Sequence, residues 1–241
     1  MDAHRTRRKA FRDTGATATD HGVPTALCVD LGDDQKQALL TRVLSGPASA
    51  QEAAVFRGQI LTEMAGLSVE DGMVMQIHAG SRRTTDPAML RSRGPNQGSD
   101  IPVPVDPVRE LAPLLNKYGT EPGFRLIFFC LDETVYAREL APMAGYWPAL
   151  MIGPLWWFHD SPRGIARYSD QLVETAGFRN LAAFNDDTRV LLSIPARHDV
   201  WRRGVCNFLG GLVAQHTLSS SDALRIATWL SADAAKVAYV L

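Results

Sequence analysis

Ionisable and aromatic side chains follow the apolar segments of strand length in this sequence. They are Asp20-His21-Gly22 after a segment ending at Thr19, His78–Arg83 after MVMQI, Asp132-Glu133 after FRLIFFCL, Trp156–Asp160 after LMIGPL, and Asn185–Arg189 after LAAF. In parallel α/β folds the carboxyl ends of the strands carry the binding and catalytic residues, so we expect these groups to share one cavity. Arginines suit a carboxylate, while carboxylates and histidine suit hydroxyl and proton chemistry. This set favours a small anionic or polyhydroxylated substrate.

Each of these groups also has an ordinary structural explanation. A single histidine after a strand, such as His78, is more often a hydrogen-bonded structural residue than a catalyst. Asp20 and Asp187 can be explained as caps of following helices, the commonest role of aspartate there. The remaining candidates can be explained as packing or solvated side chains: Trp156, Trp157, Arg83 and Arg189. Their recurrence at successive strand ends is what favours a common site.

The elements that must position these residues alternate along the chain. Strands are predicted over Met73–Ile77, Phe124–Leu131, Leu150–Phe158 and Leu181–Phe184, and FRLIFFCL is typical of a parallel strand covered on both faces. Helices are predicted over residues 49–64, 106–119, 161–177, 197–216 and 221–239. This alternation predicts an α/β fold with a parallel sheet, in one domain covering residues 1–241.

The predicted helix ends rest on specific residues. Ser49 and Glu52 have the spacing of a capping box. Asp106-Pro107 and Ser161-Pro162 each combine an N-cap residue with a proline at the first helical position. These signals fix the starts of three of the helices.

Length, composition and charge narrow the class of protein. The 241 residues are 46% apolar and 21% charged, as in soluble globular proteins. A net charge of -1 excludes a globally basic nucleic-acid-binding protein. The length also matches that of a complete (β/α)₈ barrel, about 250 residues.

Neither a secretory signal nor a membrane span is predicted. The basic N-terminus lacks an apolar h-region. The uncharged stretch Leu140–Phe158 contains three prolines that would break a lipid-exposed helix. The cysteines lack metal-ligand spacing and are expected to be buried free thiols of a cytoplasmic protein: Cys28, Cys130 and Cys206.

Several segments together resemble the uronate (glucuronate) isomerase family of the amidohydrolase superfamily. They are GATATDHGVPTA (15–26), GMVMQIHAGSRR (72–83), ELAPMAGYWPALMIGPLWWFHDSPRG (139–164) and FNDDTRVLLSIPARHDVWRRGVCNFLGGLV (184–213). The resemblance implies a TIM-type (β/α)₈ barrel. Family members are about twice as long and carry a His-x-His metal motif in their first half, which this sequence lacks. The chain therefore resembles the C-terminal half, about strands 4–8 with their helices, and the N-terminal half is expected to be absent.

The resemblance also implies roles for individual residues. Asp187 matches the aspartate that ligates the metal and moves the C2 proton, and Arg189 matches the arginine near the reacting end of the substrate. The matched substrate-binding residues are His78, Arg83, Asp20 and Trp156. Thr84-Thr85-Asp86 stand where family members carry asparagines, a departure at the carboxylate or hydroxyl contacts.

The activity implied is the isomerisation of D-glucuronate to D-fructuronate and of D-galacturonate to D-tagaturonate through a cis-enediol. Asp187 would be the base, Arg189 and a divalent metal, usually zinc, would stabilise the oxyanion, and Arg83 would hold the substrate carboxylate. The expected partner is a hexuronate, with no nucleotide or redox cofactor, nucleic acid or membrane. The full-length form is expected to be a homo-oligomer.

Two alternatives stay open. A metal-dependent hydrolase on the same scaffold also uses an aspartate at strand 8. A truncated, non-catalytic fragment would leave an open five-stranded sheet with exposed apolar edges. With only part of the motif set present, the isolated chain is expected to be inactive without the N-terminal half.

Overall fold

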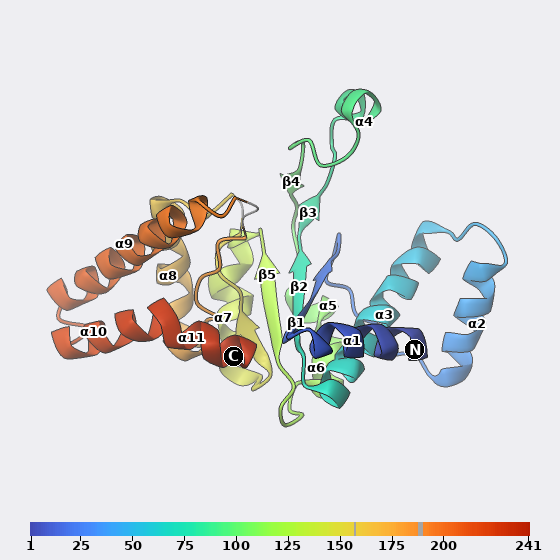
Figure 1. Cartoon of the computed structure of the whole chain (residues 1–241), viewed down its shortest axis with the longest axis horizontal. Helices are drawn as coiled ribbons and strands as arrows, with labels where there is room; N and C mark the ends of the chain where they lie inside the picture. Colours follow the sequence, from blue (N-terminus) through green and yellow to red (C-terminus); the bar gives the residue numbers. More distant parts are fainter. Residues whose placement is uncertain (157, 188–189) are drawn as a thin grey trace.

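A four-stranded parallel sheet forms the centre of the computed structural model, which describes residues 1–156, 158–187 and 190–241 (Figure 1). The strand order is β1-β2-β5-β6, with β1 at Ala18–Gly22, β2 at Val74–Ala79, β5 at Leu126–Cys130 and β6 at Leu150–Ile152. The register places His78 of β2 between Gly22 of β1 and Phe129 of β5. The predicted α/β class with a parallel sheet is confirmed.

Helices connect and flank these strands. The α-helices are α1 (Asp2–Asp13), α2 (Asp33–Leu44), α3 (Ala50–Asp71), α4 (Pro87–Arg93), α5 (Pro107–Glu110), α6 (Ala112–Tyr118), α7 (Ala141–Tyr146), α8 (Pro162–Ala176), α9 (Ser193–Ala214), α10 (Ser220–Thr228) and α11 (Ala234–Tyr239). Short 3₁₀ or π turns are η1 (Glu133–Val135), η2 (Tyr136–Leu140), η3 (Phe178–Asn180) and η4 (Trp229–Asp233).

Two of the strand predictions are wrong in extent. The run Leu150–Phe158 is a strand only over β6, because Pro154 has no N–H to donate to a ladder. In Leu181–Phe184 only Leu181 pairs, in an isolated bridge to Ile152. Ala183 adopts a left-handed φ of 64°, which ends the extended conformation. The sheet therefore has four strands rather than five in the described part of the chain.

The helix predictions hold best where caps are strong. The Ser49 hydroxyl accepts from Glu52 N and Glu52 accepts from Ser49 N, so the predicted capping box starts α3. The predicted helix 106–119 is divided into α5 and α6, because Pro113 cannot donate the hydrogen bond that would join them. The predicted helix 221–239 is interrupted by the π turn η4.

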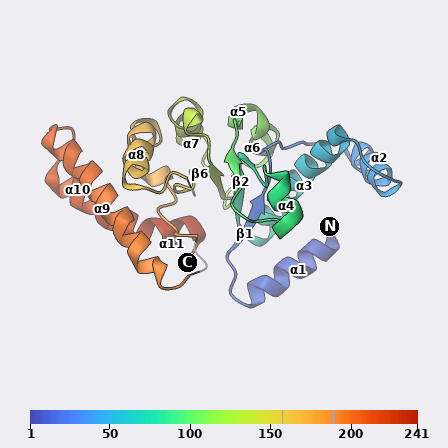
Figure 2. The ribbon, with the colours of Figure 1, turned by 90° about the horizontal axis from the view of Figure 1, so that it is seen from above.

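The sheet has two apolar faces of different size. Met75, Ile77, Leu126 and Phe128 belong to the large cluster shared with helices α3, α6, α7 and α8. The alternate residues of the same strands face a smaller cluster, which is completed from other segments: Val74, Ile127, Phe129, Leu131, Met151, Trp156, Ala182 and Ala238. Figure 2 shows α5 to α8 on one side of the sheet and α1 and α11 on the other. The second face is thus the more sparsely covered one.

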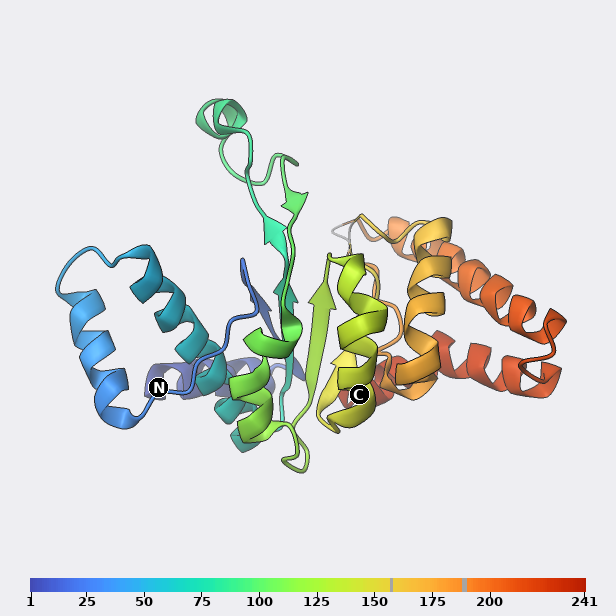
Figure 3. The ribbon, with the colours of Figure 1, turned by 180° about the vertical axis from the view of Figure 1, so that it is seen from behind.

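A two-stranded antiparallel arm leaves the carboxyl end of β2. It consists of β3 (Ser81–Arg82) and β4 (Ile101–Pro102), with α4 at its tip, and it projects beyond the sheet (Figure 3). Gly80, at the root of the arm, has a φ of 87°, and a Cβ there would lie 2.7 Å from Val105 Cγ2. The backbone can therefore turn into the arm only with glycine at this position. No motif in the sequence predicted this element.

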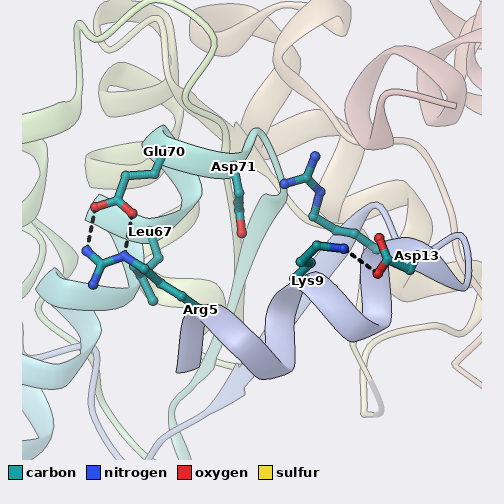
Figure 4. A pocket seen from close by; sticks show the side chains of 7 residues that line it. Arg5, Lys9, Asp13, Leu67, Glu70 and Asp71 are labelled. Carbon is teal, nitrogen blue, oxygen red and sulfur yellow. Dashed lines mark hydrogen bonds and ion pairs between the residues drawn. The ribbon is translucent and has the colours of Figure 1, made fainter. Parts of the chain in front are cut away.

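Ion pairs fasten α1 to the end of α3. The guanidinium of Arg8 is buried, with Nε 2.6 Å from Asp71 Oδ2 and Nη2 3.0 Å from Ser68 Oγ. Arg5 makes a two-pronged contact with Glu70 at the rim of the hollow between the two helices (Figure 4). The basic N-terminal segment is therefore an integral helix of this fold.

Two further expectations can be compared with the structure. Cys28 and Cys130 are buried free thiols as predicted, but Cys206 is exposed because it lies on the solvent side of α9. Among the described residues, no helix combines the length and apolarity needed to cross a bilayer.

Candidate active site

A cavity of about 90 Å³ lies on the sparsely covered face of the sheet, beside β2 and β5. Its walls come from four separate segments of the chain: His78, Phe129, the pair Leu155 and Trp156 with Asp160, and the group Asn185, Asp187 and Arg197. Three of the residues predicted from the sequence, His78, Trp156 and Asp187, are therefore brought together.

His78 is the most firmly held of these residues. Its Nδ1 lies 2.6 Å from Asp20 Oδ1. The imidazole stacks on Phe129, with ring centroids 4.0 Å apart and planes at 17°, and meets Trp156 edge-on at 4.7 Å. His78 also lies within β2 rather than after it, so backbone pairing on both sides fixes its main chain. Asp20 thus reaches the site through His78 without lining the cavity.

The Asp20–His78 pair has an electrostatic consequence. Partial burial alone would raise the pKa of Asp20, but the hydrogen bond from His78 and its charge outweigh it, so the pKa lies below its ordinary value. Next to it, burial lowers the pKa of His21 to about 4, against a smaller opposing effect of Asp20. The carboxylate of Asp20 is therefore ionised and His21 neutral at physiological pH.

Unlike His78, Asp187 lies outside the strands of the sheet. Its backbone has a left-handed φ of 42°, and the residue is exposed, in contrast to the buried run 181–184 before it. Non-glycine residues with positive φ are uncommon and cluster at functional sites, and aspartate is among the types that tolerate this region. Neither Asp187 nor Asp20 caps a helix, because the N-cap positions of α9 and α2 are Leu192 and Gly32.

Of the two predicted arginines, Arg83 is not among the residues that line the described cavity. Arg83 follows β3 at the root of the arm, where its Nη1 lies 3.3 Å from Asp100 Oδ2 and its side chain is about half exposed. Arg189 lies outside the described residues. Among the described residues, the arginine that lines this cavity is Arg197.

Asp160 and Asn185 belong to the strand-end groups expected to share a cavity, although the sequence assigned them no individual role, and Arg197 was missed. Arg197 Nη2 donates to Asp160 Oδ2. Both residues stand in segments that carried the family resemblance, WWFHD and IPARHD, and this was the available signal.

A polar relay extends from the cavity wall to the last helix. Asn185 Nδ2 donates to the Tyr239 hydroxyl at 3.0 Å, and that hydroxyl donates to Gln76 Oε1 at 2.8 Å. Burial raises the pKa of Tyr239 to about 12, with a smaller contribution from the charge of Asp20. Tyr239 therefore stays protonated and ties α11 to β2 across the sparsely covered face. Nothing in the sequence predicted the Tyr239–Gln76 hydrogen bond, whose partners are 163 positions apart.

The side chains that could bind a metal ion are scattered over the described residues. The described residues contain no group of three or more His, Cys, Asp or Glu side chains placed to hold one. Stable sites for zinc need three or four protein ligands. Taken alone, the described part of the chain does not fit a metal centre.

Comparisons with known proteins agree with one another. The family model described as glucuronate isomerase matches residues 1–231. Uronate isomerases of Sphingopyxis alaskensis and Phenylobacterium zucineum are each 52% identical over 241 residues, which cover 100% of this chain and 51% and 50% of those proteins. The chain thus spans about half the length of the curated relatives it matches.

Solved structures give the same result. The crystal structure of glucuronate isomerase from Caulobacter crescentus has a TM-score of 0.98 and 49% identity, over 99% of this chain and 50% of that one. Uronate isomerase from Thermotoga maritima shares the fold, with a TM-score of 0.89 at 24% identity, over 96% of this chain and 51% of that one. From its sequence and its fold, the chain belongs to the uronate (glucuronate) isomerase family.

Proposed function

We propose that this chain supplies one wall of a uronate isomerase active site. The reactions are the interconversion of D-glucuronate with D-fructuronate and of D-galacturonate with D-tagaturonate. One observation carries the proposal: His78, Trp156 and Asp187, from segments far apart in sequence, line a single cavity. Membership of the family gives the reaction class.

The proposed chemistry is a proton transfer between adjacent carbons. A base removes the proton from C2 of the open-chain aldose and returns it to C1 of the cis-enediol, giving the ketose. Asp187 is the carboxylate that lines the cavity on its exposed side, and we assign it this role. Arg189 is assigned to the developing oxyanion on the family resemblance alone.

His78 is proposed to bind a substrate hydroxyl. An ionised carboxylate only accepts hydrogen bonds, so Asp20 fixes the imidazole with its proton on Nδ1. Nε2 is then the ring nitrogen available to a ligand hydroxyl. Trp156 packs against the ring and narrows the cavity beside it.

The small volume of the cavity supports a site whose remaining wall comes from residues outside this sequence. Ligand pockets usually enclose about 300–1,000 Å³. The described cavity of about 90 Å³ accommodates one end of a six-carbon acid. We propose that the sheet forms strands 4–8 of a (β/α)₈ barrel of the amidohydrolase type, whose other strands supply the remaining wall. The parallel strand order and the half-length match to relatives support this arrangement.

A divalent metal, zinc being the expected one, would take Asp187 as its single ligand from this chain. Its other ligands would lie outside the described residues, which hold no three-ligand group. No step above depends on the metal.

Reconstitution tests the proposal. The 241-residue chain is combined with a segment matching the rest of the Caulobacter crescentus relative, with zinc and D-glucuronate, and the sugar is followed by NMR in D₂O. Ketouronate formation is expected, with deuterium at C1 wherever the exposed Asp187 exchanges its proton with solvent before returning it. An assembled complex that yields no ketouronate contradicts the proposal, and hydrolysis of a lactone without isomerisation would favour a hydrolase.

A further inference from the structure

His159 is a largely buried histidine to which the chemistry described above gives no role. It is not among the residues that line the cavity, although Trp156 before it and Asp160 after it both are. Its side chain is 14% exposed. The imidazole Nε2 donates to the carbonyl oxygen of Leu131 at 2.8 Å. A carbonyl oxygen can only accept, so the proton lies on Nε2. This hydrogen bond joins segments that are 28 positions apart in the sequence.

The hydrogen bond connects the two segments that carry the aromatic neighbours of His78. Leu131 follows closely after Phe129, whose ring stacks on the imidazole of His78. His159 N donates to the carbonyl oxygen of Trp156 at 3.0 Å, and Trp156 meets His78 edge-on. The His159 side chain therefore ties the segment after β6 to the end of β5, next to the two rings that contact His78.

The segment between β6 and α8 is also attached at its two ends. At its start, the hydroxyl of Tyr168 on α8 donates to the carbonyl oxygen of Gly153 at 2.8 Å. At its end, the Ser161 hydroxyl accepts from Gly164 N, and a Cβ on Gly164 would lie 1.8 Å from the His159 carbonyl oxygen. Both of these attachments are to α8, whereas the His159 side chain attaches the segment to β5.

Charged groups complete the surroundings of the imidazole. Glu133 Oε1 lies 3.7 Å from His159 Nδ1, which is beyond hydrogen-bond distance. Arg167 of α8 donates to the same carboxylate oxygen through Nε at 3.2 Å and Nη2 at 3.0 Å. Because Arg167 already matches the charge of Glu133, that carboxylate does not require the imidazole as its partner. The hydrogen bond to Leu131 is therefore the contact that orients the ring.

We propose that His159 is a positioning residue, which holds Trp156 against His78 and thereby orders the cavity wall before a ligand binds. Its effect on ligand binding rests on the proposed isomerase function, because His78 is there assigned to a substrate hydroxyl. Without the Nε2 donor, the segment after β6 keeps its attachments to α8 and loses this attachment to β5. Trp156 then gains freedom, and ordering it again on binding costs free energy.

The first test is NMR of the 241-residue chain with isotope-labelled histidine. The ring currents of Trp156 and Phe129 displace the ring resonances of His78, so these resonances report where Trp156 lies. His159→Leu removes the donor at a similar volume, and His159→Gln restores an N–H near the position of Nε2. The His78 resonances should move in His159→Leu and stay in place in His159→Gln.

The matched control is Tyr136→Phe. It removes another side-chain hydrogen bond to the backbone at the end of β5, which runs from the Tyr136 hydroxyl to the Cys130 carbonyl oxygen at 2.7 Å. Tyr136 packs in the large cluster and is not among the residues that line the cavity. This variant should lose stability without moving the His78 resonances.

The second test is D-glucuronate binding and turnover by the reconstituted complex. His159→Leu should raise Kd and KM about fivefold, the effect of losing one hydrogen bond, and change kcat less than about twofold. His159→Gln and Tyr136→Phe should both stay within about twofold of the unsubstituted protein in all three constants. This split between KM and kcat is the effect expected of a residue that orders the binding wall.

The possible outcomes separate the two proposals. Unmoved His78 resonances in His159→Leu, moved resonances in His159→Gln, or equal loss of binding in Tyr136→Phe overturns the positioning role. If His159→Leu does not fold, His159→Asn, whose amide is too short to reach Leu131, replaces it in the same comparison. Moved resonances in His159→Leu together with an unsubstituted complex that forms no ketouronate support the positioning role and contradict the isomerase.

Discussion

The two sides of the cavity are built in different ways. On the sheet side, His78 is held by backbone pairing to two strands, a hydrogen bond to Asp20 and contacts with two aromatic rings, and its side chain is 12% exposed. On the other side, Asp187 is exposed and has a left-handed backbone conformation.

This difference assigns ligand binding to the sheet side, with His78, and proton transfer to the side with Asp187. The core of this chain prepares the wall that orients a ligand, because its side chains are fixed by packing that exists before the ligand arrives. The carboxylate assigned to proton transfer is exposed to water, and in the arrangement proposed above the other strands of the barrel would supply the low-dielectric surroundings that strengthen such chemistry. Changes on the sheet side should therefore alter stability and binding, and changes at Asp187 should alter turnover alone.

The largest expected effect is on turnover. Asp187→Asn in the reconstituted enzyme should lower kcat by about 10²–10⁴-fold, the usual contribution of a general base. Asn tolerates the left-handed backbone as well as Asp, so the melting temperature should stay unchanged. Steady-state kinetics and thermal unfolding measure the two quantities. The matched control is Asp170→Asn on the exposed side of α8, and equal losses in both variants would break the comparison.

The second effect falls on the sheet side. A Cβ on Gly153 would lie 2.7 Å from the ring of Phe129, which stacks on His78. Gly153→Ala should lower the free energy of unfolding by about 1–3 kcal/mol and also weaken hexuronate binding. Gly210→Ala, on α9 with nothing within 4 Å of the added methyl, should instead stabilise the chain slightly. Urea unfolding compares them, and equal stability of the two variants contradicts the packing argument.

A smaller effect depends on pH. The pKa of His21 is lowered from 6.5 to about 4, mainly by burial, so the unfolded chain binds a proton in this range before the folded chain does. Stability is therefore full above pH 6.5 and falls as the pH approaches 4, by about 1 kcal/mol between pH 7 and 5.5. Urea unfolding at these pH values measures it. His21→Gln, which cannot titrate, should lose this slope, and an unchanged slope assigns the effect elsewhere.

The smallest expected effect is that of metal on the chain by itself. Because the described residues include no three-ligand group, zinc should neither bind stoichiometrically at micromolar concentration nor shift the melting temperature. Calorimetric titration and thermal unfolding with and without a chelator measure this. Tight zinc binding by the chain alone would show that the Asp187 side is already complete and would remove the contrast between the two sides.

Local signals accounted for most of the fold. Capping residues act within a few positions, so Ser49, Glu52 and Ser161 predicted the starts of α3 and α8 correctly. Composition did not reveal backbone conformation: LAAF has the residues of a strand, yet the left-handed φ of Ala183 leaves it only one bridge. The arm was missed because its two short strands pair across a polar, proline-containing segment with no hydrophobic period.

The site was predictable only where its residues follow strands, because contacts between segments far apart in the sequence leave no local signal. His78, Trp156 and Asp187 follow apolar runs, so their convergence follows from parallel strands. Arg197 lies inside a helix, where nothing in the local pattern distinguishes it from a solvated arginine. It is held in the cavity wall by the ion pair with Asp160, 37 positions away in the sequence, which no local pattern reveals.

The relay through Tyr239 gives the cavity wall a fixed hydrogen-bond polarity. The phenol hydroxyl carries one proton, which it gives to Gln76, so it must receive the proton of Asn185 Nδ2. The amide of Asn185 is thereby locked with its nitrogen toward α11, and its carbonyl oxygen is not used in the relay. Because this carbonyl oxygen can only accept a hydrogen bond, this part of the wall favours a ligand hydroxyl, which donates, over an ether or carbonyl oxygen, which cannot. Methylating one sugar hydroxyl at a time would therefore map which carbon of a bound ligand lies against Asn185.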